Sequence, residues 1–139
     1  MPGFRMLDNW LNQLLDDVAP SSDHGRLPFG HYRLHDPGIL ELIPNQVQPD
    51  ARACVLSAAV HGNETAPVEL IGELTSRLEA GLIRLGAPVL ILIGNPPALR
   101  AGERFITTNL NRLFKRDLTA SGEEPDRART LMAAVDDFF

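Results

Sequence analysis

The sequence predicts an α/β fold built around a mostly parallel or mixed sheet. Two nearly continuous apolar runs, residues 53–60 and 88–94, have the composition of strands that are covered on both faces. Between them, residues 67–81 carry apolar side chains at helical spacing. A strand, a helix and a second apolar strand in this order form a βαβ unit, in which the two strands run parallel.

Two further helices are predicted outside this unit. Apolar residues recur at helical spacing over about residues 5–18, and Pro20 ends this predicted helix. The segment 121–139 closes the chain with a second helical pattern, which has Pro125 near its start. Its apolar stripe is made of Leu131, Met132, Val135 and Phe138.

The chain between the first helix and the βαβ unit predicts a hairpin between two loops. Residues 31–35 and 39–43 flank the sequence Asp-Pro-Gly at 36–38, which is typical of a tight turn. Residues 20–30 and 44–50 are rich in proline and small polar residues, so we expect them to be loops.

Length and composition are those of one globular domain. The 139 residues suffice for a stable core, and 44% of them are hydrophobic. The net charge of −5, with scattered basic residues, gives no reason to expect a nucleic-acid partner. No apolar run is long enough to span a membrane, and polar residues interrupt residues 1–20, so we expect no signal peptide there. The single cysteine, Cys54, lies in an apolar run, so we expect it to be buried and the protein to be cytoplasmic.

The first candidate site follows the strand at 53–60. His61 and Glu64 are three residues apart, so a turn into the next helix brings both side chains onto one side. A histidine and a carboxylate are two of the three protein ligands of a His₂Glu catalytic zinc site. The alternative is that these residues form an ordinary turn between the strand and the helix and bind no ligand. The position after a buried strand favours a site, because open α/β sheets bind ligands at the carboxyl ends of their strands.

The second candidate site follows the strand at 88–94. Arg104, Asn111 and Arg112 place two guanidinium groups and an amide within nine positions. Arginine holds carboxylates through paired hydrogen bonds, and an arginine aimed at a carbonyl oxygen can stabilise an oxyanion. Because the two strands are parallel, we expect both candidate sites at the same edge of the sheet. A solvated basic surface is the alternative, although apolar residues at 110–114 imply packing.

The other histidines are weaker candidates. His31 and His35 share a predicted strand face with Arg33, which is typical of a solvated face, and His24 lies in a polar loop. The signatures of nucleophile-elbow hydrolases, P-loop proteins and dinucleotide enzymes do not occur in the sequence.

Three ordered motifs carry a resemblance to a known family. HGNETAPVELI begins at His61, GNPPALRAGERF begins at Gly94 and NLNRLF begins at Asn109. In this order and spacing, they resemble the succinylglutamate desuccinylase/aspartoacylase family of zinc-dependent amidohydrolases, which are relatives of the zinc carboxypeptidases. The segment GILELIP at 38–44 and the C-terminal helix also fit, so the resemblance covers most of the chain.

The resemblance implies a fold, a reaction and a set of roles. The fold would be a three-layer α/β fold of the zinc-carboxypeptidase-like (phosphorylase/hydrolase-like) type, here truncated. The reaction would be zinc-dependent hydrolysis of N-succinyl-L-glutamate to succinate and glutamate, in the succinyl route of arginine breakdown. His61 and Glu64 would ligate one Zn²⁺ ion. Arg104 would polarise the scissile amide carbonyl, while Asn111 and Arg112 would hold a carboxylate of an acidic substrate.

Two departures from the family pattern bear on the site. Asn109 stands where the family usually has aspartate, which removes a carboxylate that would support an arginine from the second shell. The family's third zinc ligand, a histidine, and its general-base glutamate are expected beyond residue 139. We therefore expect residues 1–139 to be one partial catalytic domain, the N-terminal part of the enzyme, and to be inactive alone. Self-association into a homo-oligomer is one way to cover the open side of the sheet.

Two other functions stay open. A related zinc amidohydrolase or carboxypeptidase could act on a different acyl-amino acid or peptide terminus, because residues beyond the chain largely shape the pocket. A non-catalytic metal- or anion-binding module, complete at 139 residues, would use His61 and Arg112 to bind a ligand or a partner chain.

Overall fold

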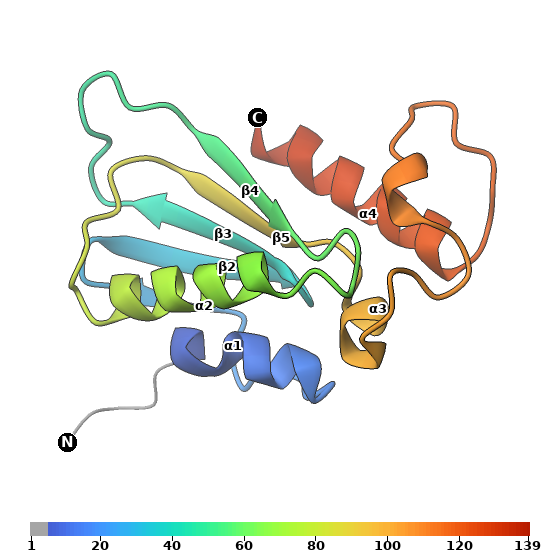
Figure 1. The fold of residues 1–139 in the computed structure, drawn as a ribbon. Coiled ribbons are helices and arrows are strands. Elements are labelled where there is room, and N and C mark those ends of the chain that lie inside the picture. The colour runs from blue at the N-terminus through green and yellow to red at the C-terminus, as the bar shows by residue number, and fades with distance from the viewer. Residues whose placement is uncertain (1–5) are drawn as a thin grey trace.

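The computed structural model describes residues 6–139, which form a sheet with helices on both faces (Figure 1). The strands are β1 (His24–Leu27), β2 (Gly30–Asp36), β3 (Ile39–Pro44), β4 (Cys54–Ala58) and β5 (Val89–Ile93). The helices are α1 (Met6–Leu15), α2 (Ala66–Glu79), α3 (Pro96–Ala101) and α4 (Glu123–Phe138), with a 3-10 turn, η1 (Leu110–Arg112). The strand order is β1-β2-β3-β5-β4. The sheet is mixed, because β4 and β5 pair parallel while the other neighbours are antiparallel.

The predicted βαβ unit is confirmed. All five residues of β4 pair in parallel with β5, and α2 connects the two strands. Pro67 in the first turn of α2 favours the helix start, since its missing N–H would have no intrahelical partner there. Within the predicted helical range, Val68, Ile71 and Leu78 are buried against the sheet, whereas Leu70 is 68% exposed and lies outside the apolar stripe.

The predicted hairpin is also confirmed as β2 and β3, but the loop predicted at 20–30 is wrong in part. Residues 24–27 form β1, which pairs antiparallel with β2. The Tyr32 ring of β2 packs over Gly25, so the absence of a side chain at Gly25 makes room for it. This pairing gives strand structure to a short polar segment that has little strand propensity of its own.

Two hydrophobic cores lie on opposite faces of the sheet, which gives three layers (Figure 1). α1 and α2 cover one face, where the Trp10 Nε1–H donates to Thr75 Oγ1 at 3.1 Å. α4 and η1 cover the other face, where Leu110 and Leu131 are buried. No helix in the part of the chain from residue 6 onward is both long and apolar enough to cross a membrane.

The first helix is shorter than the predicted range of 5–18. α1 ends at Leu15, and Val18 is 54% exposed rather than part of an apolar stripe. Asp17, which follows the helix, adopts a left-handed backbone conformation with a φ of +55° that a helix does not allow. Residue 5, the predicted start, lies outside the described residues.

β4 lies between the two cores as the sequence predicted, with Leu56 packed against one and Val55 against the other, but it is less buried than expected. It forms one edge of the sheet, with Ser57 exposed and Cys54, Val55 and Leu56 only half-buried. The expectation of a fully buried Cys54 is therefore wrong for the described structure. Continuous apolar composition indicates burial, but it does not tell whether a neighbouring strand provides it.

Candidate functional site

The chain turns sharply where β4 ends. Ala59 has a φ of +56°, a left-handed conformation that alanine rarely adopts. Its carbonyl accepts a hydrogen bond from the backbone N–H of Asn95, at 2.8 Å. Asn95 follows β5, so this bond joins the carboxyl ends of the two parallel strands. The turn places the residues after Ala59 at that end of the sheet, beside α3.

His61 has a polar partner at each ring nitrogen. Its Nδ1 lies 2.9 Å from Oε1 of Glu64, and its Nε2 lies 3.1 Å from Oδ1 of Asn109. The His61 side chain is 13% exposed, whereas that of Glu64 is 61% exposed. The predicted convergence of His61 and Glu64 is therefore present, and a third residue, Asn109, orients the ring from the other side.

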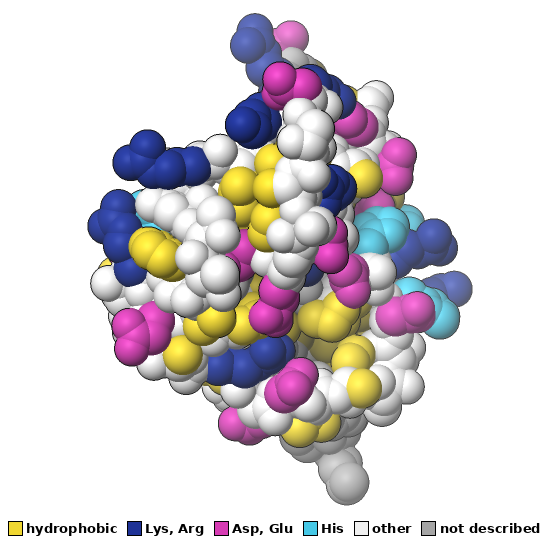
Figure 2. All heavy atoms as spheres, turned by 90° about the vertical axis from the view of Figure 1, so that its right-hand side faces the viewer, with side chains coloured by type: hydrophobic (Ala, Val, Ile, Leu, Met, Phe, Trp, Pro, Cys, Tyr) yellow, Lys and Arg dark blue, Asp and Glu magenta, His cyan; other side chains and the backbone are white. Residues whose placement is uncertain are grey.

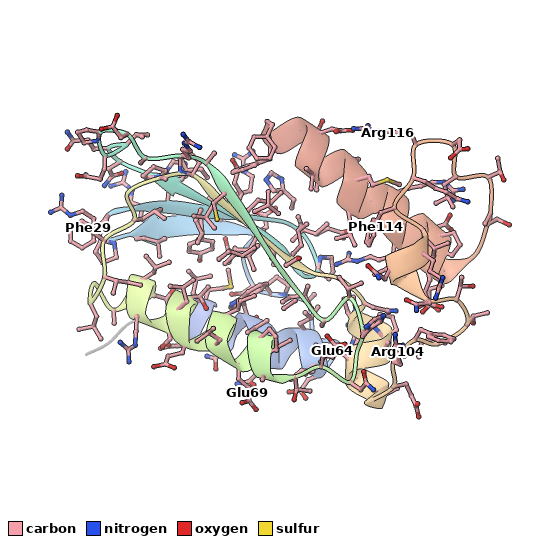
Figure 3. The ribbon with its side chains drawn as sticks, turned by 45° about the horizontal axis from the view of Figure 1, so that its top comes forward. Phe29, Glu64, Glu69, Arg104, Phe114 and Arg116 are labelled. Carbon is pink, nitrogen blue, oxygen red and sulfur yellow. The ribbon has the colours of Figure 1, made fainter. Side chains whose placement is uncertain are left out.

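Close backbone packing holds this turn in place. The Gly62 N–H donates to the carbonyl of Arg104 at 3.2 Å. A Cβ at Gly62 would collide with the backbone of Ala98 in α3, so only glycine fits. The two sequence motifs predicted at one edge of the sheet do meet there, and Figure 3 shows Glu64 and Arg104 at the same end of the molecule.

α3 was missed in the sequence, although its caps are recognisable. The buried Asn95 is the N-cap, and its Oδ1 accepts a hydrogen bond from the N–H of Ala98. Pro96 and Pro97 occupy the first turn, and Gly102, with a φ of +68°, ends the helix. Asn-Pro-Pro followed by glycine is thus a local signal for a short helix at this position.

A buried carboxylate organises the segment that follows α3. Glu124 of α4 is 3% exposed. Its Oε1 accepts hydrogen bonds from the N–H groups of Thr107 and Thr108, both at 2.6 Å. Its Oε2 accepts from the Ile106 N–H at 2.9 Å and from Asn95 Nδ2 at 2.8 Å. Burial alone would raise the pKa of Glu124, but these hydrogen bonds outweigh it and hold the pKa below its usual value.

The predicted catalytic residue Arg104 and the predicted substrate-binding residues are exposed on the same segment. Arg104 and the η1 residues Asn111 and Arg112 all face solvent. Asn109 caps η1, since its Oδ1 accepts the N–H of Asn111 at 3.1 Å and its carbonyl accepts the N–H of Arg112. Its side chain therefore supports the ring of His61, and not an arginine as the sequence suggested.

The remaining histidines lie elsewhere, and two of them contact carboxylates of their own. His35 Nε2 is 2.6 Å from Glu41 Oε1, and His24 Nδ1 is 2.8 Å from Asp23 Oδ1. His31 is exposed on β2, as predicted. Within residues 6–139 no three His, Cys, Asp or Glu side chains are grouped closely enough to hold a metal ion.

His61 and Glu64 nevertheless offer the kinds of donor atom that two of the ligand positions of a zinc site require. Metal-ligating histidines usually donate one ring N–H to an oxygen acceptor and bind the metal through the other nitrogen. If Nε2 of His61 donates to Asn109, Nδ1 keeps its lone pair on the side of Glu64. One nitrogen and one carboxylate oxygen then face the same point, which agrees with the ligand chemistry of zinc.

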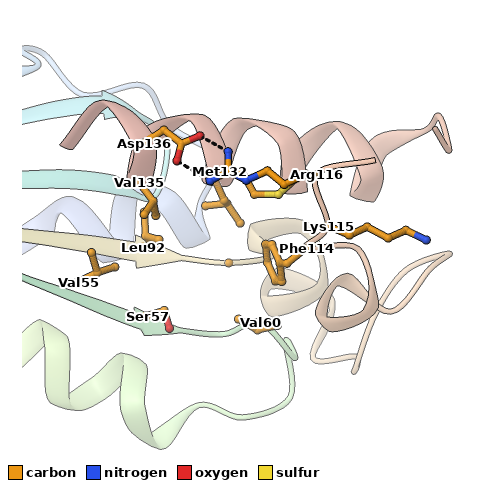
Figure 4. A pocket seen from close by; sticks show the side chains of 12 residues that line it. Val55, Ser57, Val60, Leu92, Phe114, Lys115, Arg116, Met132, Val135 and Asp136 are labelled. Atoms are coloured by element: carbon orange, nitrogen blue, oxygen red, sulfur yellow. Dashed lines mark hydrogen bonds and ion pairs between the residues drawn. The ribbon is translucent and has the colours of Figure 1, made fainter. Parts of the chain in front are cut away.

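An apolar groove of about 360 Å³ lies between β4 and α4, next to the candidate site (Figure 4). Val60, which precedes His61, and Phe114, which follows Arg112 by two positions, line its end. Arg116 and Asp136 form a two-armed ion pair at its rim. Figure 2, which faces the end of the molecule with α3, shows basic and acidic side chains interspersed over this surface.

Comparison with known proteins connects this geometry to a family. The sequence profile of the succinylglutamate desuccinylase/aspartoacylase catalytic domain matches residues 50–139. A succinylglutamate desuccinylase of Burkholderia cenocepacia is 43% identical over the whole chain, and one of Yersinia enterocolitica is 38% identical over 96% of it. The alignments span 42% and 40% of these two relatives.

Solved structures agree with the sequence comparison. The crystal structure of succinylglutamate desuccinylase from Vibrio cholerae superposes with a TM-score of 0.86 at 31% identity. It covers 94% of this chain and 39% of that one. The enzyme from Vibrio parahaemolyticus gives a TM-score of 0.85 at 32% identity and covers 93% of this chain and 44% of that one. The fold thus corresponds to a portion of these structures, and the chain belongs to the succinylglutamate desuccinylase/aspartoacylase family.

Proposed function

We propose that the full-length protein carrying this chain is a zinc-dependent amidohydrolase that hydrolyses N-succinyl-L-glutamate to succinate and glutamate. The observation that carries the proposal is the convergence of His61 Nδ1 and Glu64 Oε1, 2.9 Å apart, with Asn109 against the opposite ring nitrogen. His61 and Glu64 would hold the Zn²⁺ ion. When bound, zinc polarises a carbonyl and makes a bound water acidic near neutral pH.

The residues of this chain supply substrate recognition around that point. The Arg104 carbonyl accepts a hydrogen bond from the N–H of Gly62, which fixes the Arg104 backbone beside the His61 turn. In the proposal, Arg104 stabilises negative charge on the oxygen of the scissile amide. Asn111 and Arg112, exposed on η1, bind a carboxylate of the substrate. N-succinylglutamate carries three carboxylates, so a cationic, solvent-facing segment suits it.

In this proposal His61 and Glu64 supply two of the zinc ligands, and no third His, Cys, Asp or Glu joins them within residues 6–139. The chain spans about 40% of the length of the curated relatives. We therefore propose that residues 1–139 are a partial catalytic domain, and that residues outside it provide the third ligand and the general base. On this view, the 139-residue chain does not catalyse the reaction alone. A cytoplasmic location and a role in arginine breakdown belong to the same proposal.

The test is hydrolysis by the full-length protein. We expect succinate release from N-succinylglutamate, lost on removal of zinc by a chelator and restored by added Zn²⁺. N-succinylglutamine, which lacks one carboxylate, should be hydrolysed much less efficiently. Hydrolysis of another acyl-amino acid in place of N-succinylglutamate would favour a relative of different specificity. Binding of dicarboxylates without any hydrolysis would contradict the proposal and favour a non-catalytic module.

A further inference from the structure

The backbone path between Arg104 and Asn109 is held by one buried carboxylate, that of Glu124. Phe105 and Ile106 are 39% and 44% exposed, so side-chain burial does little to fix their path. Three consecutive N–H groups, those of residues 106–108, instead point at the carboxylate of Glu124. Charge-assisted hydrogen bonds of this kind are short and about twice as strong as neutral ones.

The same carboxylate also reaches the sheet. Its Oε2 accepts from Nδ2 of Asn95, which is 1% exposed and follows β5 directly. Asn95 in turn caps α3 and donates its N–H to Ala59, the residue at the sharp turn before His61. One buried network therefore connects α4, the end of β5 and the segment that carries the predicted substrate residues.

We propose that Glu124 is a positioning residue: it fixes the path of residues 106–108 and so the placement of Arg104 on one side and Asn109 on the other. This inference rests on the proposed function for its catalytic consequence. Glu124 itself is buried beneath the loop and bonded to backbone, so it acts through those residues rather than on substrate. Loss of its carboxylate would loosen the contact of Asn109 with His61 and the aim of Arg104.

Glu124→Gln is the direct test, because both carboxylate oxygens of Glu124 accept N–H groups. The glutamine side chain keeps one acceptor oxygen, but an NH₂ group replaces the other oxygen. This NH₂ group would face N–H donors, with which it cannot form hydrogen bonds. In the full-length protein we expect kcat/KM to fall roughly ten- to a hundredfold, by analogy with other outer-shell partners, while zinc content is retained. Glu124→Asp keeps the charge and should recover part of that loss.

Two control variants separate positioning from general stability. Thr75→Val removes the buried partner of Trp10 on the opposite face of the sheet, so it destabilises the fold without touching the segment. Glu123→Gln removes an exposed carboxylate next to Glu124. Both should keep wild-type kcat/KM when assayed well below their melting temperatures.

Amide hydrogen exchange gives a second readout that needs no activity. In Glu124→Gln, the amides of residues 106–108 should exchange at least tenfold faster, while those of α1 and α2 stay unchanged. Unaltered exchange at these amides, or kinetics indistinguishable from Thr75→Val, would overturn the inference. If Glu124→Gln does not fold, the same criteria apply to Glu124→Asp. If the wild type does not hydrolyse N-succinylglutamate, the proposed function fails, and exchange alone still decides the role of Glu124.

Discussion

The Nε2 atom of His61 lies 3.1 Å from Oδ1 of Asn109, although 48 positions separate the two residues in the sequence. The contact exists because the turn after β4 and the cap of η1 meet at one end of the sheet. It leaves Nδ1 of His61 directed at Glu64. The proposed metal site thus depends on the segment after β5 as much as on the turn that contains both ligands.

Substitution of Asn109 should change zinc affinity in a predictable direction. Asn109→Asp places a carboxylate against Nε2 of His61, which strengthens that hydrogen bond, so zinc affinity should rise. Asn109→Leu removes the acceptor, and we expect a loss of about 10–100-fold in zinc affinity of the full-length protein. Competition with a fluorescent zinc chelator measures the zinc affinity of both variants. Equal affinity in all three proteins would show that Asn109 does not support the metal ligand.

Gly62→Ala adds only one methyl group, but it should lower both the stability of the fold and the zinc affinity of the site. The added methyl group would collide with the backbone of α3, so the turn must shift, at a cost of about 1–3 kcal/mol. Gly102→Ala is a matched control, because Gly102 also requires backbone adaptation but has open space around its Cβ position. Urea unfolding should show both variants destabilised, while zinc affinity should fall in Gly62→Ala alone. Lower zinc affinity in both variants would mean that the collision with α3 does not cause the loss of zinc binding in Gly62→Ala.

The stability of the fold should depend on pH through Glu124. Its pKa is lowered in the folded state from the ordinary value of 4.5, so its contribution is present above that value and is lost as pH falls through the folded pKa. Urea unfolding of the 139-residue chain between about pH 6 and pH 3 should therefore show an acid-dependent loss that is smaller in Glu124→Gln. Thr75→Val, which removes a buried hydrogen bond but no titrating group, should keep the wild-type slope. An unchanged slope in Glu124→Gln would contradict the assignment.

Arg112→Ala in the full-length protein should weaken substrate binding without loss of metal. Arg112 is exposed on η1, and no described contact ties its guanidinium to His61 or Glu64. We expect kcat/KM to fall roughly 10- to 150-fold, because a hydrogen bond to a charged group contributes about 1.5–3 kcal/mol. Arg77→Ala, on the exposed face of α2, is the control. Zinc lost together with activity would show that the role of Arg112 is misassigned.

Much of the fold could be predicted because its pattern is local. Apolar runs with a helical stripe between them predicted β4, α2 and β5, and a turn sequence predicted the hairpin of β2 and β3. β1 could not be predicted, because residues 24–27 become a strand only by pairing with β2. That β4 is the strand at the open edge could not be predicted for the same reason, since composition does not say which strands become neighbours.

Only those features of the candidate site that arise from residues close together in the sequence, or from the parallel strands, could be predicted. The spacing of His61 and Glu64 predicted that they converge, and the parallel strands predicted that the arginine-bearing segment lies nearby. The role of Glu124 had no sequence signal, because a carboxylate in the first turn of a helix usually faces solvent and interacts with the helix dipole. Only the packing of α4 against the end of β5 brings it under residues 106–108.

The central claim, that His61 and Glu64 are two ligands of an incomplete zinc site, is tested most directly by zinc titration of two proteins. The full-length protein should bind one Zn²⁺ ion tightly, and His61→Ala should abolish that binding. The 139-residue chain should bind zinc only weakly, because two ligands without a third seldom hold the ion against water. Tight one-to-one binding by the 139-residue chain that His61→Ala abolishes, or full-length binding that His61→Ala leaves intact, would contradict this account.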